Sequence, residues 1–273
     1  MPLIAITREM GSLGKDVASG LGEALGVPVI YHEVIDHLAD RMRLRRSHVV
    51  RLLDGSAGLL ERLTSDKTSL FIHTADELIG MSLQGKGAVI RGWGATHLLR
   101  DVPHAVCVRV CAPREVRQQR MMERLGTSDA VQVAEEIHRS DEAHTAIMRR
   151  NFGLQWTDPE NYDVVLNTER VSVQDCVDEI LGLVRSAEFA ETEKSRRQLE
   201  DLALSARVWA ALRRAPETRQ TKASVTSNSG VVAVAGCGTD ELLKIVEIAV
   251  AVPGVRDVVY RPRESGDTRP PLH

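Results

Sequence analysis

Residues 3–16, LIAITREMGSLGKD, decide the fold class of this chain. An apolar run typical of a buried strand is followed by a loop that contains Gly11 and Gly14, and Lys15 stands at the start of a helical pattern that ends near Leu25. In strand–loop–helix units of this kind, loop N–H groups and the positive helix N-terminus face an anion, and a lysine adds a point charge. The stretch therefore predicts a phosphate-binding loop, with Lys15 in contact with a β- or γ-phosphate.

The loop matches the standard pattern G-x-x-x-x-G-K-[ST] only in part. Glu9 stands where that pattern has its first glycine, and Asp16 stands where it has a Ser or Thr that holds Mg²⁺. Gly11 and Gly14 would let the backbone approach an anion closely, and Ser12 adds a hydroxyl group. Asp16 could bind Mg²⁺ through a water molecule or stabilise the helix start, and its position favours the second role.

Length and composition indicate a soluble globular protein with one large domain or two. The chain has 273 residues, of which 43% are hydrophobic and 27% charged, and its formal net charge is −3. This balance gives no electrostatic case for nucleic acid as a partner, and a content of 3% aromatic residues argues against a base-stacking platform.

The N-terminus and the cysteines bear on the location of the protein. No apolar run approaches the ~20 residues of a membrane-spanning helix, and MPLIAITREM lacks the charged and apolar regions of a signal peptide. We therefore expect a cytoplasmic protein with no transmembrane segment. The four cysteines lack the spacing of a zinc site and are expected to be reduced thiols: Cys107, Cys111, Cys176 and Cys237.

Short apolar runs alternate with helical patterns in the first two-thirds of the chain, which predicts an α/β fold with a parallel sheet between layers of helices. The expected strands are 3–7, 27–31, 88–91, 105–111 and 163–167. The expected helical stretches are 14–25, 33–54, 57–84, 113–150 and 173–184. We place this first domain at residues 1–185.

The pattern changes after residue 185. Residues 186–201 are rich in charge and lack Pro and Gly, which predicts an exposed helical linker. A second, smaller α/β domain is expected at 202–262, in the order helix, strand, strand, helix and strand. Its elements are 202–215, 222–226, 231–235, 241–252 and 255–260, and a Pro-containing flexible tail is expected at 263–273.

Several arginines are candidates for binding phosphate. Arg114, Arg117, Arg120 and Arg124 follow strand 105–111 at helical spacing, so three or four of them share one face. A row of guanidinium groups suits the charge that develops during phosphoryl transfer, and a solvated helix face is the alternative. A second basic group could meet an acceptor phosphate, although by itself it is more typical of a surface: Arg41, Arg43, Arg45, Arg46 and Arg51.

Asp141 and His144 are expected on a later helix. Asp141 could orient a nucleotide or a metal ion, whereas a lone histidine such as His144 more often packs or lies on the surface. The chain contains no H-x-x-x-H pair and no G-x-S-x-G motif, so metalloenzyme and hydrolase chemistry is disfavoured.

With these elements in place, residues 3–184 resemble the cytidylate-kinase-like family of P-loop nucleoside monophosphate kinases. The segments that carry the resemblance are ITREMGSLGKDVASGLGEALGVPVIY, VIRGWGATHLLRDVPHAVCVRVCAP and the run from Asp141 through GLQWTDPENYDVVLNT. The resemblance implies a P-loop kinase fold and an ATP- and Mg²⁺-dependent transfer of phosphate to a nucleoside monophosphate such as CMP or dCMP. It also implies that the arginine-bearing region after Pro113 is a mobile lid.

The family's loop pattern, S-R-x-x-G-S-x-G-[RK], fits this chain at Thr7, Arg8, Gly11, Ser12, Gly14 and Lys15. The resemblance and the residue patterns described above together predict three sets of site residues. The nucleotide is held by Arg8, Gly11, Ser12, Leu13, Gly14, Lys15 and Asp16, with Asp16 as the Mg²⁺ ligand. The transferring phosphoryl group is stabilised by Lys15, Arg117, Arg120 and Arg124. The acceptor is bound by Arg41, Gly92, Trp93, Asp141 and His144.

Two positions depart from the family on the acceptor side. Trp93 follows Gly92 where the family has Gly-Arg, and His144 stands where an arginine is expected three residues after Asp141. Each charged hydrogen bond lost there costs about 1.5–3 kcal/mol. Two hypotheses therefore stand side by side, an active kinase and a nucleotide-binding sensor with little or no activity. A purely structural dimerisation protein is a third.

Residues 202–262 resemble a BON domain, through VVAVAG at 231–236 and VPGVRDVVYRP at 252–262. BON domains are regarded as binding modules for phospholipid surfaces or other ligands. The resemblance therefore implies a regulatory module that binds a ligand, a partner protein or a phospholipid surface. The alternative is an appended domain that serves homodimerisation or stability.

Overall fold

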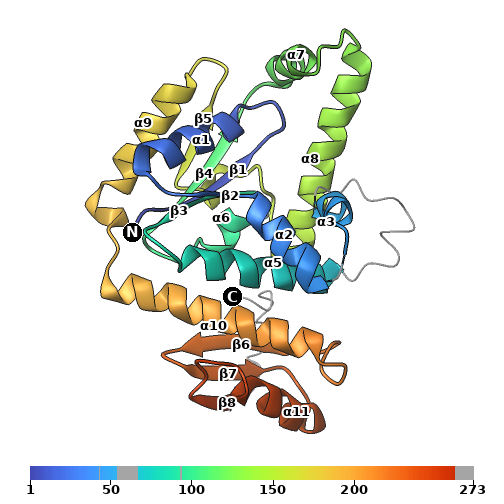
Figure 1. Cartoon of the computed structure of the whole chain (residues 1–273), viewed down its shortest axis with the longest axis vertical. Coiled ribbons are helices and arrows are strands. Elements are labelled where there is room, and N and C mark those ends of the chain that lie inside the picture. The colour runs from blue at the N-terminus through green and yellow to red at the C-terminus, as the bar shows by residue number, and fades with distance from the viewer. Residues whose placement is uncertain (43, 54–66, 93, 262–273) are drawn as a thin grey trace. The chain divides into compact units, whose positions relative to one another are not determined.

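The computed structural model describes residues 1–42, 44–53, 67–92 and 94–261. They form two compact units (Figure 1). The first comprises Met1–Ser65 and Gln84–Glu191, and the second comprises Asp66–Leu83 and Thr192–His273. The second unit thus includes a helix from the middle of the chain, α5 (Lys67–Ser82). Among the helices described, none combines the length and the apolar character that crossing a bilayer requires.

The first unit contains a five-stranded sheet in the order β2-β3-β1-β4-β5. Its strands are β1 (Leu3–Arg8), β2 (Val29–Ile30), β3 (Ala88–Arg91), β4 (Ala105–Cys111) and β5 (Val164–Asn167), and all neighbours are parallel. The predicted parallel sheet is confirmed, although β2 is shorter than expected. Because β1 is the central strand, the loop after it lies at the middle of the carboxyl edge, where open α/β sheets bind ligands.

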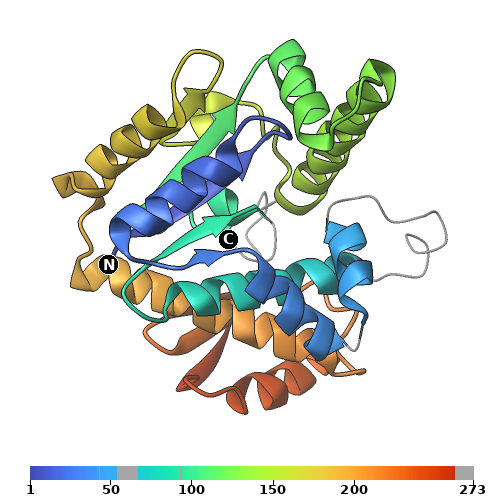
Figure 2. The same cartoon turned by 45° about the horizontal axis from the view of Figure 1, so that its top comes forward.

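The two faces of the sheet are covered differently. Helices α1 (Gly14–Leu25) and α9 (Val173–Val184) pack side by side on one face, together with Ile6 of β1 (Figure 2). Thr7, the next residue, points to the opposite face, where its hydroxyl lies 2.9 Å from a hydroxyl of α6 (Ala95–Leu98). The alternation along β1 and β4 therefore separates an apolar face from a face that carries polar groups.

Two of the stretches that the sequence predicts as helical each hold two helices. They hold α2 (His32–Met42) and α3 (Arg46–Leu53), and α7 (Arg114–Leu125) and α8 (Ala130–Phe152). Gly126 ends α7 with φ of 64°, and Asp129 starts α8 by accepting a hydrogen bond from the N–H of Gln132. A left-handed glycine and an Asp N-cap are ordinary signals for the end and the start of a helix. Short 3-10 turns, η1 (Pro159–Asn161) and η2 (Ala187–Phe189), complete the unit.

The second unit contains a three-stranded sheet in the order β6-β7-β8. Its elements are α5, α10 (Glu193–Arg214), β6 (Ser224–Asn228), β7 (Val231–Ala235), α11 (Thr239–Val250) and β8 (Asp257–Arg261). β6 and β7 form an antiparallel hairpin with Ser229 and Gly230 at positive φ, and β8 is parallel to β7. The order helix, strand, strand, helix and strand that the sequence predicts is present in this unit.

Helix α10 is continuous from Glu193, so the residues predicted as a helical linker continue into the helix of the second unit. Its N-terminus is fixed by a capping box between Thr192 and Ser195. Leu199 and Trp209 are buried, and α10 packs against α5 and β6. This packing orders a helix whose sequence is otherwise dominated by charge.

We expect Trp209→Ala to destabilise the second unit by about 3–5 kcal/mol, because it removes a fully buried aromatic side chain and leaves a cavity. Urea unfolding followed by circular dichroism measures the loss. Leu243→Ala is the matched control, since Leu243 is 73% exposed and its truncation should change the free energy of unfolding by less than about 0.5 kcal/mol. Equal destabilisation by the two substitutions would contradict the packing described.

Candidate phosphate-binding site

The loop between β1 and α1 is held in a tight turn. Gly11 and Leu13 have positive φ, of 81° and 61°. The N–H and the hydroxyl of Ser12 both donate to the carbonyl oxygen of Glu9, at 3.2 and 2.8 Å. A non-glycine residue in the left-handed region costs on the order of 1 kcal/mol and is frequent where a ligand is clamped. Leu13 is thus the strained residue of the loop, and it is also the N-cap of α1.

Amide groups at the start of α1 are available to a ligand. None of the described residues accepts a hydrogen bond from the backbone N–H of Gly11, Leu13, Gly14 or Lys15. The 12-residue helix adds its positive dipole end at the same place. The side chain of Lys15 is exposed and forms no ion pair with a described residue. Amides, dipole and ammonium group together are the features of an anion site.

The two glycines of the loop are in close contact with other parts of the chain, which leave no space for a side chain. A Cβ on Gly14 would lie 2.6 Å from the Cβ of Arg8, and a Cβ on Gly11 would lie 2.7 Å from the carbonyl oxygen of Arg117. Both distances are shorter than side chains tolerate. The sequence suggests that these glycines let an anion approach the backbone closely. The structure adds a second reason, which is that they let the loop pack closely against β1 and α7.

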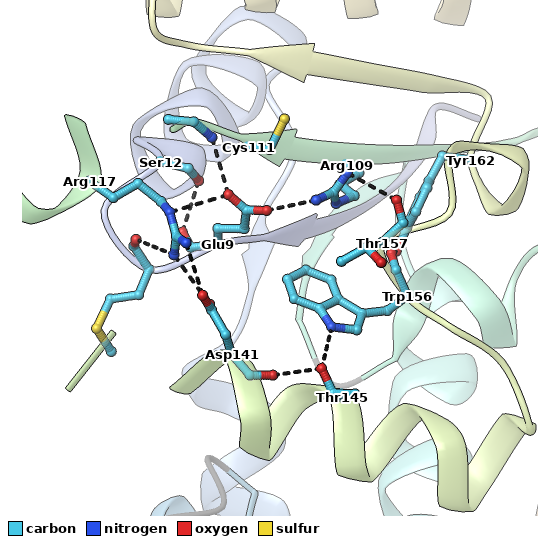
Figure 3. Close-up of polar contacts among 12 residues, drawn as sticks. Glu9, Ser12, Arg109, Cys111, Arg117, Asp141, Thr145, Trp156, Thr157 and Tyr162 are labelled. Carbon is cyan, nitrogen blue, oxygen red and sulfur yellow. Dashed lines mark hydrogen bonds and ion pairs between the residues drawn. The ribbon is translucent and has the colours of Figure 1, made fainter. Parts of the chain in front are cut away.

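Glu9 is the centre of a buried ion-pair network (Figure 3). Its carboxylate accepts a hydrogen bond from Arg109 Nη2 at 2.6 Å and one from the N–H of Ala112 at 3.2 Å. The Nε of Arg117 lies 3.3 Å from the same carboxylate. Arg117 also donates two hydrogen bonds to Asp141, at 2.9 and 3.2 Å. Two carboxylates and two guanidinium groups thus balance in charge at the edge of the sheet.

Sequence reasoning missed Glu9 and Arg109 as members of the site. One signal was present, because Arg109 is the single charged residue of the apolar strand 105–111, and a buried charge needs an opposite one. Another was that Glu9 replaces a glycine of the standard loop pattern. The pairing itself is not written in any local pattern, since the two residues are 100 positions apart.

The predicted row of arginines on α7 is divided between two environments. Arg117 is buried, and Arg120 donates to the hydroxyl of Thr168 at 3.0 Å and to its carbonyl oxygen at 2.8 Å. Thr168 in turn donates to the carbonyl oxygen of Ser12 at 2.9 Å, so Arg120 is tied to the loop through one residue. The other two members are exposed: Arg114 and Arg124. Contact of this row with a phosphate stays a prediction.

His144 packs beside the network. Its ring lies 4.3 Å from the ring of Trp156, and its Nε2 is buried without a hydrogen-bond partner among the described residues. Burial is the main reason why the pKa of His144 is lowered to about 4, and His97, Arg8 and Arg109 act in the same direction. His144 is therefore neutral at pH 7, at a position where the sequence comparison led us to expect an arginine.

One face of α8 carries several of these groups. Asp141, His144 and Thr145 are spaced so that they lie on the same side of the helix. Thr145 accepts a hydrogen bond from Trp156 Nε1 at 3.0 Å, and the carbonyl oxygen of Trp156 accepts one from Tyr162 at 2.6 Å (Figure 3). This face of α8 is thereby connected both to Arg117 and to the segment before β5.

The remaining predicted residues are described in part. Gly92 follows β3 with φ of 85°, and a Cβ there would meet nothing within 4 Å. Trp93 lies outside the described residues, and Arg41 lies in α2 with a side chain that is not described. Asp16 is exposed and does not cap α1 through a side-chain hydrogen bond. Asp16 is left with two roles, a favourable charge at the helix N-terminus and binding of a metal ion.

Comparison with known proteins finds a family model and solved structures that match this chain. The cytidylate kinase-like family model matches residues 3–170. Among solved structures, an uncharacterized protein from Eubacterium ventriosum is 22% identical with a TM-score of 0.54, over 68% of this chain and 99% of that one. A shikimate kinase from Bacteroides thetaiotaomicron is 14% identical with a TM-score of 0.41, over 67% of this chain and 98% of that one. No curated protein matches the chain.

We expect His144→Gln to reduce the loss of unfolding free energy that occurs when the pH is lowered from 7 to 5. The folded protein keeps His144 neutral down to a pKa of about 4, whereas an unfolded histidine takes up a proton near pH 6.5. Between these values the unfolded state binds more protons, so stability falls as pH falls, by up to about 3 kcal/mol. The free energy of unfolding in urea at pH 7 and pH 5 measures the effect.

His138→Gln is the matched control, because His138 is an exposed histidine of the same helix. The free energy that is lost between pH 7 and pH 5 should be smaller in His144→Gln than in wild type or in His138→Gln. Equal losses in all three proteins would show that His144 titrates normally.

Proposed function

The chain belongs to the cytidylate kinase-like family, and from that premise we propose that it transfers a phosphoryl group from ATP to a nucleoside monophosphate such as CMP or dCMP, or to a related small molecule. The observation that carries the proposal is the loop between β1 and α1. Its available amides and the exposed ammonium group of Lys15 are the contacts that donor phosphates need.

In this proposal the protein positions the phosphates and supplies charge. In-line phosphoryl transfer requires little covalent chemistry from an enzyme, so orientation and electrostatic stabilisation provide the rate. Lys15 and Arg8 form no ion pair with a described residue, and they would hold the donor phosphates. Arg117, Arg120 and Arg124 of α7 would stabilise the transferring group.

Asp16 fits the role of a Mg²⁺ ligand. Mg²⁺ is commonly held by one or two carboxylates together with substrate phosphates and waters. Asp16 is an exposed carboxylate in the first turn of α1, and its side chain makes no hydrogen bond with a described residue. When bound, Mg²⁺ would neutralise charge on the phosphates. Lys15 and Asp16 would then serve the phosphates and the metal ion from one helical turn.

The acceptor would be bound on the side of α8. We propose Arg41, Gly92, Trp93, Asp141 and His144 as its contacts, although Trp93 and His144 stand where the family has arginines. A neutral His144 holds a phosphate less strongly than an arginine, which favours an acceptor with hydrogen-bonding groups at that point.

A second candidate function is a nucleotide-binding sensor with little or no transfer activity. The neutral His144 and the engagement of Arg117 by two carboxylates favour it, because both reduce the positive charge available to an acceptor phosphate. Such a sensor would signal through a BON-like module at 202–262 that binds a ligand, a partner protein or a phospholipid surface, or that joins two copies of the chain. The order α10-β6-β7-α11-β8 is compatible with this module.

We expect the protein to release ADP from ATP and Mg²⁺ when one of a panel of nucleoside monophosphates is present. Lys15→Ala should lower this rate by about 10²-fold or more, because a group that stabilises the phosphates is lost. A coupled ADP-release assay measures the rate. Lys86→Ala, which removes an exposed lysine from a turn before β3, should leave it unchanged.

The same assay, run beside a calorimetric titration of Mg·ATP binding, separates the hypotheses. ATP binding without turnover above the level of Lys15→Ala would reject the enzyme and favour the sensor. Absence of ATP binding would reject both and favour a structural role.

A further inference from the structure

Glu9 places a negative charge in a loop that should attract phosphates. The contacts of its carboxylate explain why a negative charge stands there. The carboxylate is held by three groups from outside the loop, which are Arg109 of β4, the N–H of Ala112 and Arg117 of α7. Arg117 in turn donates to the carbonyl oxygen of Met10 at 3.4 Å, and its own carbonyl oxygen packs on Gly11. Glu9 therefore holds the first turn of α7 against the loop.

The two carboxylates that bind Arg117 differ in exposure. The side chains of Glu9 and Arg117 are 10% and 7% exposed, whereas that of Asp141 is 29% exposed. Water screens the pair with Asp141 more strongly, so that pair is the easier one to exchange for another anion. The pair between Arg117 and Glu9 is the more stable of the two, because breaking it would leave two buried charges unpaired.

We propose that Glu9 is a positioning residue, which keeps the guanidinium of Arg117 beside the loop so that the transferring phosphoryl group takes the place of Asp141 on it. The proposal rests on the phosphoryl transfer proposed above. While Asp141 is in place, the charges of the network cancel and Arg117 adds no net attraction for a resting nucleotide. Exchange of Asp141 for the phosphoryl group makes the guanidinium available during transfer.

Removal of the charge on Glu9 should move binding and turnover in opposite directions. Glu9→Gln keeps the size of the side chain and an oxygen that Arg109 can reach, but it makes the loop region more positive. Mg·ATP should therefore bind ~3–10-fold more tightly. Arg117 loses its ion pair with Glu9 and is no longer held beside the loop, so kcat should fall ~10–100-fold. A merely structural role would lower affinity, turnover and thermal stability together.

The test compares wild type, Glu9→Gln, Arg117→Gln and the double variant. Calorimetric titration gives the Kd of Mg·ATP, ADP release with the active acceptor gives kcat, and thermal unfolding reports on folding. Glu23→Gln is the matched control, because it removes the same charge from an exposed position of α1 and should behave as wild type. If Glu9 acts through Arg117, the double variant turns over no more slowly than Arg117→Gln.

Tighter or unchanged binding together with a lower kcat in Glu9→Gln supports the proposal. Parallel loss of affinity and turnover, unchanged values of both, or additive losses in the double variant overturn it. If Glu9→Gln does not unfold cooperatively, Glu9→Asp decides, because it keeps the charge but draws the carboxylate away from Arg117: a lower kcat with retained affinity supports the proposal, and an unchanged kcat overturns it.

Failure of the proposed function gives a different result. A wild-type protein that releases no ADP with any acceptor rejects the transfer reaction, and binding of inorganic pyrophosphate then decides about Glu9. Tighter pyrophosphate binding by Glu9→Gln than by wild type supports the charge balance on which the proposal depends. Equal or weaker binding, or no binding by either protein, overturns it.

Discussion

The ion pair between Glu9 and Arg117 is the interaction on which the site depends. It joins the loop after β1 to α7, while Arg109 joins the same carboxylate to β4 and Asp141 joins Arg117 to α8. Elements that are distant in the sequence therefore meet at the carboxyl edge of the sheet. Unpaired buried charges are costly, so these elements can pack together only when the four charges are paired, and the charges are paired only when the elements pack together.

Features of the fold that depend on local signals could be predicted. Strand β4 follows from its apolar residues, and the hairpin of the second unit follows from the turn residues Ser229 and Gly230. The boundary between α7 and α8 also has local signals, in Gly126 and Asp129. The membership of α5 in the second unit could not be predicted, because it depends on packing against α10, far later in the chain.

The candidate site shows the same limit. The position of Lys15 at the start of a helix follows from the loop pattern, whereas helical spacing identifies Arg117 without showing what surrounds it. The carboxylates that hold Arg117 come from two other elements, and no periodicity relates them to α7. The lowered pKa of His144 likewise arises from burial in the folded protein. The residue types of the site were therefore accessible from the sequence, and its electrostatics were not.

Charge balance also bears on the role of a metal ion. With Arg109 and Arg117 paired, Lys15 and Arg8 still form no ion pair with a described residue, and they act on the loop together with the dipole of α1. A triphosphate carries more negative charge than these groups offset, and Mg²⁺ beside Asp16 would offset part of the remainder without disturbing the buried pairs. A loop in which Glu9 takes the place of a glycine is therefore compatible with phosphate binding. Glu9 lowers the net positive charge beside the loop, and it also fixes the position of Arg117.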